Sequence, residues 1–279
     1  MTNQIHPCLW FDGKAKEAAE FYCSIIKNSK ITADTPIVVT FELNGKKIMG
    51  LNGGPMFKIN PSISLFISCE TLDETNEIWN KLIADGGKAL MPIDKYPWSE
   101  RYGWLQDKFG MTWQIMVANS GDKGLKITPS MLFTGRVFGK AEEAVNFYSS
   151  VFENSSTDVM LKYPEGDANA GKVMFSEFKL NNDTIIAMDG PGEHDYTFTE
   201  GVSFVVNCDT QKEIDFYWEK LTEGGKESMC GWLTDKFGVS WQIVPSIIGR
   251  LMTDPAKGPG VFQAILKMKK LDIETLLNA

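Results

Sequence analysis

The most informative residues for chemistry in this chain are a pair of glutamines, each of which follows a tryptophan. Gln114 lies in GWLQDKFGMTWQIM and Gln242 in GWLTDKFGVSWQIV, fourteen-residue stretches that match at ten positions. If each stretch ends in a strand, Gln114 shares one face with Met116. Two interpretations stay open. The amide hydrogen-bonds a neighbouring strand or a buried water, or it anchors a ligand in an otherwise apolar pocket.

Nucleophiles and acid–base groups are sparse. The chain has two histidines, His6 and His194, and no G-x-S-x-G motif. Cys230 could act with His194 only if the fold brought the two side chains together. Asp107 and Asp235 lie in D-K-F-G turns, where aspartate commonly bonds its own backbone. The sequence therefore identifies no catalytic residue.

Aromatic residues supply the remaining candidates for a ligand site. The segments that precede the two matching stretches differ in length: the first spans sixteen positions from Gly87 to Gly103, and the second spans six from Gly225 to Gly231. The longer segment either packs on the protein itself or forms a lid over the first cleft. In the second case Trp98 and Tyr102 would close on a ligand and Arg101 would bind an anionic group. The candidate ligand-binding residues are Gln114, Gln242, Trp98, Arg101, Tyr102, Trp104, Trp232 and Trp10.

The duplicated stretch belongs to a longer internal repeat. The segment PCLWFDGKAKEAAEFYCSII pairs with PSMLFTGRVFGKAEEAVNFYSSVF, in which four residues are inserted, and ISLFISCETLDETNEIWNKL pairs with VSFVVNCDTQKEIDFYWEKL. A repeat of this length indicates a duplicated domain, not a solenoid. We predict a first domain at 1–118, a linker at 119–127, a second domain at 128–250 and a C-terminal helical tail at 251–279. We expect the tail to pack on the domains or on a second subunit.

Each copy predicts the same order of elements. In the first copy, a strand at 7–11 precedes a helix with apolar residues at helical spacing over 15–26. Strands at 37–43 and 47–51 join across Asn44-Gly45, a hairpin signal. After a strand at 63–68, Thr71 and Glu74 form a capping box that opens a second helix, as Thr210 and Glu213 do in the second copy. The last strands are expected at 103–107 and 111–117. The predicted fold is α+β, with paired βαβββ modules in each domain and a curved mixed sheet that encloses a cleft.

Composition excludes several classes of function. The net charge of −8 and a pI near 5.0 argue against nucleic-acid binding. No apolar run approaches the ~18 residues of a membrane span, and the N-terminal segment lacks the pattern of a signal peptide. The five cysteines include no CxxC pair, so neither a zinc site nor a disulfide framework is predicted. We expect a cytoplasmic protein.

This layout resembles the vicinal-oxygen-chelate superfamily, which includes glyoxalase I, bleomycin-resistance proteins and extradiol dioxygenases. The resemblance rests on WFDGKAKEAAEFY, LNGG, a capped helix that ends in GG, and GWLTDKFGVSWQIVP. Within the superfamily the chain is similar to the PhnB-like group, also labelled 3-demethylubiquinone-9 3-methyltransferase domains. The resemblance covers both repeats and the tail at 261–279.

The resemblance implies four metal-ligand positions in each copy. Proline, glycine and alanine offer no side-chain ligand, and a neutral amide is a weaker ligand than a carboxylate. We therefore predict no metal and no cofactor. The implied positions are Pro7 (beside His6) and Pro129, Gly50 and Ala187, 62–64 and 201–203, and Gln114 and Gln242.

Three functions remain open. We favour a protein that binds a small apolar or aromatic molecule without the usual metal. The alternatives are an enzyme of the superfamily, either a metal-assisted lyase or dioxygenase or a methyltransferase, and a structural or interaction protein whose clefts are filled by side chains. A Rossmann-type S-adenosylmethionine site needs a Gly-rich turn between a strand and a helix, whereas MDGPGEHD (188–195) is predicted to be a loop. We expect no nucleic-acid or membrane partner, and either a monomer with pseudo-dimeric domains or a homodimer.

Overall fold

The computed structural model describes residues 5–118 and 124–279, and its strands form two eight-stranded mixed sheets. Sheet A has the order β14-β15-β16-β13-β1-β4-β3-β2. Its strands are β1 (Ile5–Phe11), β2 (Lys30–Asp34), β3 (Val38–Leu43), β4 (Lys46–Asn52), β13 (Val202–Cys208), β14 (Lys226–Glu227), β15 (Trp232–Thr234) and β16 (Ser240–Pro245). Sheet B has the order β10-β11-β12-β9-β5-β8-β7-β6. Its strands are β5 (Ile63–Cys69), β6 (Lys88–Tyr96), β7 (Ser99–Gln106), β8 (Thr112–Val117), β9 (Lys126–Phe133), β10 (Ser156–Lys162), β11 (Val173–Leu180) and β12 (Asp183–Asp189).

Each sheet takes one βαβββ module from each repeat. Antiparallel pairing of β1 with β13 joins the modules of sheet A, and pairing of β5 with β9 joins those of sheet B. The predicted α+β class with paired modules is confirmed, but the expectation that each repeat closes its own sheet is wrong. The reason is that β1 and β9 are copies of one strand and β5 and β13 of another. The edge of β1 therefore pairs with β13 as well as it would with β5, and the edge of β9 pairs with β5 as well as it would with β13.

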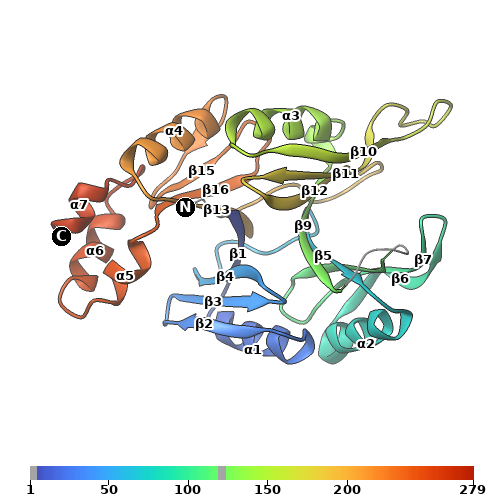
Figure 1. Cartoon of the computed structure of the whole chain (residues 1–279), viewed down its shortest axis with the longest axis horizontal. Helices are drawn as coiled ribbons and strands as arrows, with labels where there is room; N and C mark the ends of the chain where they lie inside the picture. The colour runs from blue at the N-terminus through green and yellow to red at the C-terminus, as the bar shows by residue number, and fades with distance from the viewer. Residues whose placement is uncertain (1–4, 119–123) are drawn as a thin grey trace.

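The four long helices lie in two pairs on opposite sides of the strands (Figure 1), and their apolar faces join one buried cluster with both sheets. Aromatic contacts tie the first helix of each repeat to the sheet of that repeat's other module: the ring centroids of Tyr22 and Trp113 lie 5.0 Å apart, and those of Tyr148 and Trp241 lie 5.3 Å apart. Buried residues of both repeats form one apolar core, and we call the side of each sheet that faces it the core face. The helices are α1 (Ala15–Ile25), α2 (Leu72–Ile83), α3 (Ala141–Val151) and α4 (Gln211–Thr222), with short turns η1 (Ala84–Gly86) and η2 (Gly135–Val137).

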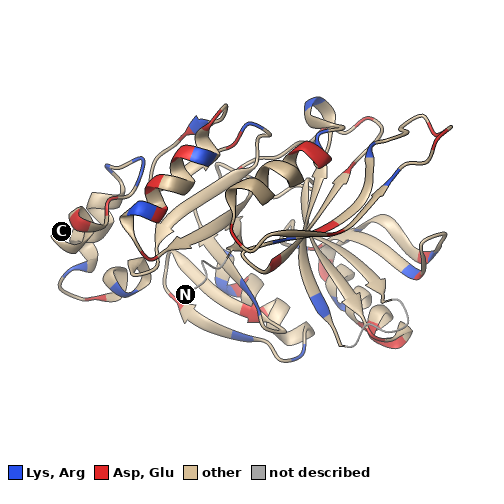
Figure 2. Ribbon diagram, turned by 45° about the horizontal axis from the view of Figure 1, so that its top comes forward, with Lys and Arg blue, Asp and Glu red and all other residues tan. Residues whose placement is uncertain are grey.

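Local signals in the sequence are matched closely by the structure. Thr210 and Glu213 make the complete capping box, while the Thr71 side chain accepts the backbone N–H of Glu74. Asn44 and Gly45 both adopt positive φ, as a tight hairpin turn requires. Charged residues lie mainly on helices, turns and the outer strands (Figure 2), and β1, β5, β8, β13, β15 and β16 contain none.

The C-terminal tail covers the opposite face of sheet A, the side turned away from the core. Its helices are α5 (Ile248–Thr253), α6 (Gly258–Ile265) and α7 (Ile273–Leu277). They bury apolar side chains against Cys8, Val205 and Val244 (Figure 1). The backbone N–H groups of Cys230 and Gly231 donate to carbonyl groups of residues 268 and 269, each at 2.7 Å. The buried tail side chains are Leu251, Val261, Ile265, Leu271 and Leu276.

None of the helices within the described ranges has the length and apolar character needed to cross a membrane. Part of the predicted linker, residues 119–123, lies outside the described residues, as do residues 1–4.

Candidate functional site

Gln114 forms the centre of a buried polar group on the opposite face of sheet B. Its Oε1 accepts a hydrogen bond from the Tyr102 hydroxyl at 2.8 Å. Its Nε2 donates to Ser64 Oγ at 2.7 Å and to Ser130 Oγ at 3.4 Å. The side chain is 4% exposed, so the predicted burial and hydrogen bonding of this amide are confirmed. Strands from both repeats supply the group, because β5, β7 and β8 come from the first and β9 from the second.

A layer of apolar and aromatic side chains surrounds this polar group. Phe66 lies 6.4 Å from Tyr102 and 6.4 Å from Phe175 between ring centroids, and Tyr96 stacks on Trp98 at 5.0 Å. Burial, and then the nearby Tyr96, raises the pKa of Tyr102 well above its ordinary value, so its hydroxyl stays protonated at neutral pH. The partly exposed members of the layer are Met91, Tyr96, Trp104, Met116, Phe175 and Met188. The face is therefore apolar at its surface, with neutral hydroxyl and amide groups beneath.

The extra segment of the first repeat is a β-hairpin, β6 and β7, not a loop. Register shifts at three places in this ladder, together with Pro92, break the alternation that identifies strands in a sequence. The hairpin extends sheet B beyond the length of its neighbours (Figure 1). It carries the cluster of Tyr96, Trp98 and Tyr102, and Trp98 at its turn is 55% exposed.

Arg101 does not lie with these aromatic side chains. Its Nε donates to Asn76 Oδ1 of α2 at 2.8 Å, on the core side of the sheet. Successive residues of a strand point to opposite faces, so a residue next to Tyr102 cannot share its face. The expectation that Arg101 would bind an anionic group of a ligand here is wrong.

Sheet A carries an equivalent polar group with fewer hydrogen-bonding members. Gln242 Nε2 donates to Ser203 Oγ at 3.0 Å, and Cys8 stands where sheet B has Ser130. Burial raises the pKa of the Cys8 thiol to about 12, although hydrogen bonds with Gln242 and Ser203 act in the opposite direction. The predicted burial and bonding of Gln242 are confirmed, since it is 5% exposed.

Side chains around Gln242 are smaller than their counterparts in sheet B. Val205 replaces Phe66, and Val244 replaces Met116. Cys230 replaces Tyr102 and packs against the tail. Smaller side chains leave volume above the strands, and close packing requires that volume to be filled. The tail fills it, so the opposite faces of the two sheets are not equivalent.

The three remaining tryptophan candidates divide between the sheets. Trp104 lies directly across from Gln114 in the β7–β8 pair and belongs to the face of sheet B. Trp10 and Trp232 form an edge-to-face pair in sheet A with centroids 5.8 Å apart. The indole N–H of Trp10 donates to the carbonyl of Gly54 at 2.7 Å. These two rings are therefore engaged with each other, away from the polar group of Gln114.

The strand register corrects the metal-ligand positions implied by the resemblance. Cys8 and Ser130, not Pro7 and Pro129, share a face with the glutamines. Gly50 faces α1, because a Cβ built on it would lie 3.1 Å from the Cβ of Ala15. A shift of one residue moves a side chain to the other face of a strand, which accounts for the difference.

A divalent metal does not fit the corrected positions. They hold hydroxyl, amide, thiol and aliphatic groups, and the Gln114 amide already bonds three hydroxyls. In the part of the chain that the structure describes, no group of three or more His, Cys, Asp and Glu side chains is arranged to hold a metal ion. A Rossmann-type S-adenosylmethionine site does not fit either, since the described strands form mixed sheets in place of a doubly wound parallel one.

The acidic candidates have structural roles. Asp107 Oδ1 accepts the backbone N–H groups of Phe109 and Met111, as the turn predicts. Asp235 does the same in the second copy, and its Oδ2 accepts from the Tyr148 hydroxyl at 2.7 Å and the Trp241 indole at 2.9 Å. Burial raises the pKa of both carboxyl groups. His194 contacts Pro191 and Tyr196, whereas Cys230 lies against the tail, so no contact joins the two.

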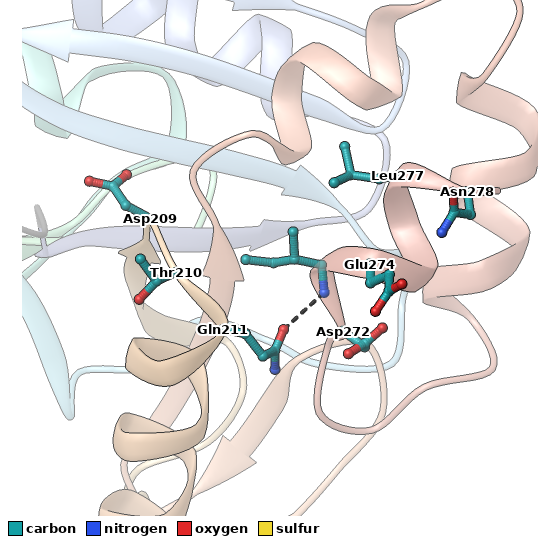
Figure 3. A pocket seen from close by; sticks show the side chains of 8 residues that line it. Asp209, Thr210, Gln211, Asp272, Glu274, Leu277 and Asn278 are labelled. Carbon is teal, nitrogen blue, oxygen red and sulfur yellow. Dashed lines mark hydrogen bonds between the residues drawn. The ribbon is translucent and has the colours of Figure 1, made fainter.

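A hollow of about 580 Å³ lies where the tail meets α4 (Figure 3). Asp272 caps α7 by accepting the backbone N–H of Thr275 at 2.7 Å. Gln211 Oε1 accepts the backbone N–H of Ile273 at 2.9 Å, and Lys270 pairs with Asp215 at 2.6 Å. These polar groups hold the tail against α4, so the hollow is part of the contact between the tail and the second domain.

Comparison with known proteins agrees with this geometry. The profile of the family described as 3-demethylubiquinone-9 3-methyltransferase matches residues 3–116 and 125–244. The chain belongs to this family. No curated protein matches the sequence.

Two solved structures illustrate the relationship. A PhnB protein from Bacillus cereus, described as a putative 3-demethylubiquinone-9 3-methyltransferase, is 36% identical over 40% of this chain and 98% of its own length, with a TM-score of 0.38. Glyoxalase I from Zea mays is 12% identical over 86% of this chain and 92% of its own length, with a TM-score of 0.55. The family profile confirms the resemblance to the PhnB-like group, and the glyoxalase I structure confirms the fold.

Proposed function

We propose that this protein binds a small, largely apolar aromatic molecule on the opposite face of sheet B. The observation that carries the proposal is the difference between two equivalent faces. In sheet A the chain's own tail covers the face around Gln242. In sheet B the face around Gln114 carries six partly exposed apolar and aromatic side chains, with no segment of the described chain laid over them as the tail is over sheet A. Such a surface is typical of ligand sites with a few placed polar groups.

The chemistry of the face indicates the kind of ligand. Flat rings would contact Trp104 and Phe175 at the surface, where aromatic contacts favour a planar molecule. The Tyr102 hydroxyl donates its hydrogen to Gln114, so its oxygen would accept a hydrogen bond from a hydroxyl or N–H group of the ligand. No cationic or anionic group takes part in this polar group, so the ligand is expected to be neutral.

Titration with 1-naphthol, a neutral planar molecule with one hydroxyl group, tests the proposal. Binding is followed by calorimetry in the wild type, in Trp104→Ala and in the matched control Trp232→Ala. We expect one site per chain, an affinity about three- to tenfold lower in Trp104→Ala, and an unchanged affinity in Trp232→Ala. Absence of saturable binding, or an equal loss in both variants, would contradict the proposal.

A further inference from the structure

A second hollow, of about 560 Å³, lies between the start of α3 and the turn that joins β15 to β16. Its lining holds four cationic and two acidic side chains, a net charge of +2 in a chain whose net charge is −8. The cationic residues are Arg136, Lys140, Lys226 and Lys236, and the acidic ones are Glu143 and Asp235.

The two acidic groups do not cancel the positive field of the hollow. Asp235 is buried and satisfied by its own turn, by Tyr148 and by Trp241. Glu143 pairs with Lys140 at 2.9 Å and with Lys236 at 3.5 Å. Arg136 makes no ion pair with any residue in the described ranges, and its Nη2 would lie 3.6 Å from a Cβ built on Gly238. One guanidinium group is thus free at the turn.

The first repeat provides an internal comparison. Its equivalents of the hollow's other charged residues are three lysines, at 14, 88 and 108, with Glu17 and Asp107. It has no counterpart of Arg136, which belongs to the segment lengthened by four residues in the second copy. Lys108 there pairs with Asp85 at 3.6 Å, and the second copy has Glu223 at the position equivalent to Asp85. The equivalent residues of the first copy therefore carry a net charge of +1, against +2 for the lining of the second copy, and Arg136 makes the difference.

We propose that this hollow binds the phosphate group of a small metabolite. A guanidinium group presents paired N–H donors that match phosphate oxygens, and lysine adds charge beside it. A phosphate monoester carries a charge close to −2 at neutral pH, which the lining balances. Arg136 and Lys140 come from the module in sheet B, whereas Lys226 and Lys236 come from sheet A. A bound phosphate would therefore link the two sheets at their junction. This site is separate from the face proposed to bind an aromatic ligand.

Titration of the full chain with inorganic phosphate tests this inference, with ³¹P line width and calorimetry as readouts. We expect saturable binding at one site, weakened about tenfold or more by Arg136→Gln. The matched control is Lys108→Gln in the first repeat, which should leave binding unchanged. Because Arg136 is exposed and unpaired, its variant should keep the wild-type melting temperature.

Three results would overturn the inference. They are the absence of saturable binding, binding that persists unchanged in Arg136→Gln, and an equal loss in Lys108→Gln. Succinate serves as a dicarboxylate competitor. If it binds as tightly as phosphate, the assignment of a phosphate group is wrong.

Discussion

Replacing Gln114 with leucine should destabilise the protein more than the same change at Gln242. Leucine fits the space but removes the acceptor of the buried Tyr102 hydroxyl and the donor to two serines. Ser64 and Ser130 face each other across β5 and β9, so they can bond one another. The tyrosine hydroxyl is then left without a partner, at a cost of about 1–3 kcal/mol. Gln242→Leu leaves Ser203 Oγ without its donor and removes the weak hydrogen bond with the Cys8 thiol, so the expected cost is about 1 kcal/mol.

Equilibrium unfolding in urea measures these costs, provided that fluorescence and circular dichroism report the same transition. The double variant Tyr102→Phe with Gln114→Leu isolates the pair. Since each change removes the same hydrogen bond, the combined cost should fall short of the sum of the single costs by about 0.5 kcal/mol or more. Strictly additive costs, or a Gln114→Leu protein as stable as the wild type, would refute the reasoning.

Three further outcomes are expected. Deletion of residues 248–279 uncovers the face of sheet A, so anilinonaphthalene sulfonate fluorescence should rise and unfolding should become easier by about 5 kcal/mol or more; an unchanged midpoint would contradict this. Burial raises the pKa of Asp235 above its ordinary 3.8. Ionisation of this carboxyl group therefore lowers the free energy of unfolding as the pH rises above 3.8. Tyr148→Phe removes a bond to that charged form, so it should cost about 1–3 kcal/mol at pH 7 and less at pH 4, and a larger cost at pH 4 would exclude the mechanism. Because Cys8 is buried with a pKa of about 12, iodoacetamide at pH 8 should alkylate Cys23 and spare Cys8, as mass spectrometry can show.

The sequence predicted local structure well because local signals have local causes. The Asn44-Gly45 turn and the Thr210 capping box depend on residues within four positions of each other. Such features are decided by the backbone and its nearest neighbours. The burial of Gln114 was instead implied by the resemblance, which places this residue at a ligand position within the cleft.

Features decided by distant contacts could not be predicted. The exchange of modules depends on the pairing of β1, β5, β9 and β13, whose sequences are duplicated. The wrong face was assigned near Cys8 because the register of β1 is defined only by its partner strand. Irregular pairing hid the β6–β7 hairpin and with it the direction of Arg101. One signal for the covered face was present: Val205 and Val244 are smaller than Phe66 and Met116 at equivalent positions, which indicates that something else fills the space above them.

Methionine methyl groups provide the most direct test of ligand binding on sheet B. Met91, Met116 and Met188 lie on the face around Gln114, whereas Met49, Met252 and Met268 lie beneath or within the tail on sheet A. In a protein labelled with ¹³C at these methyl groups, 1-naphthol should shift the resonances of the first three and leave the other three in place. Shifts confined to the sheet A group, or no saturable shift at any of the six, would contradict the proposed function.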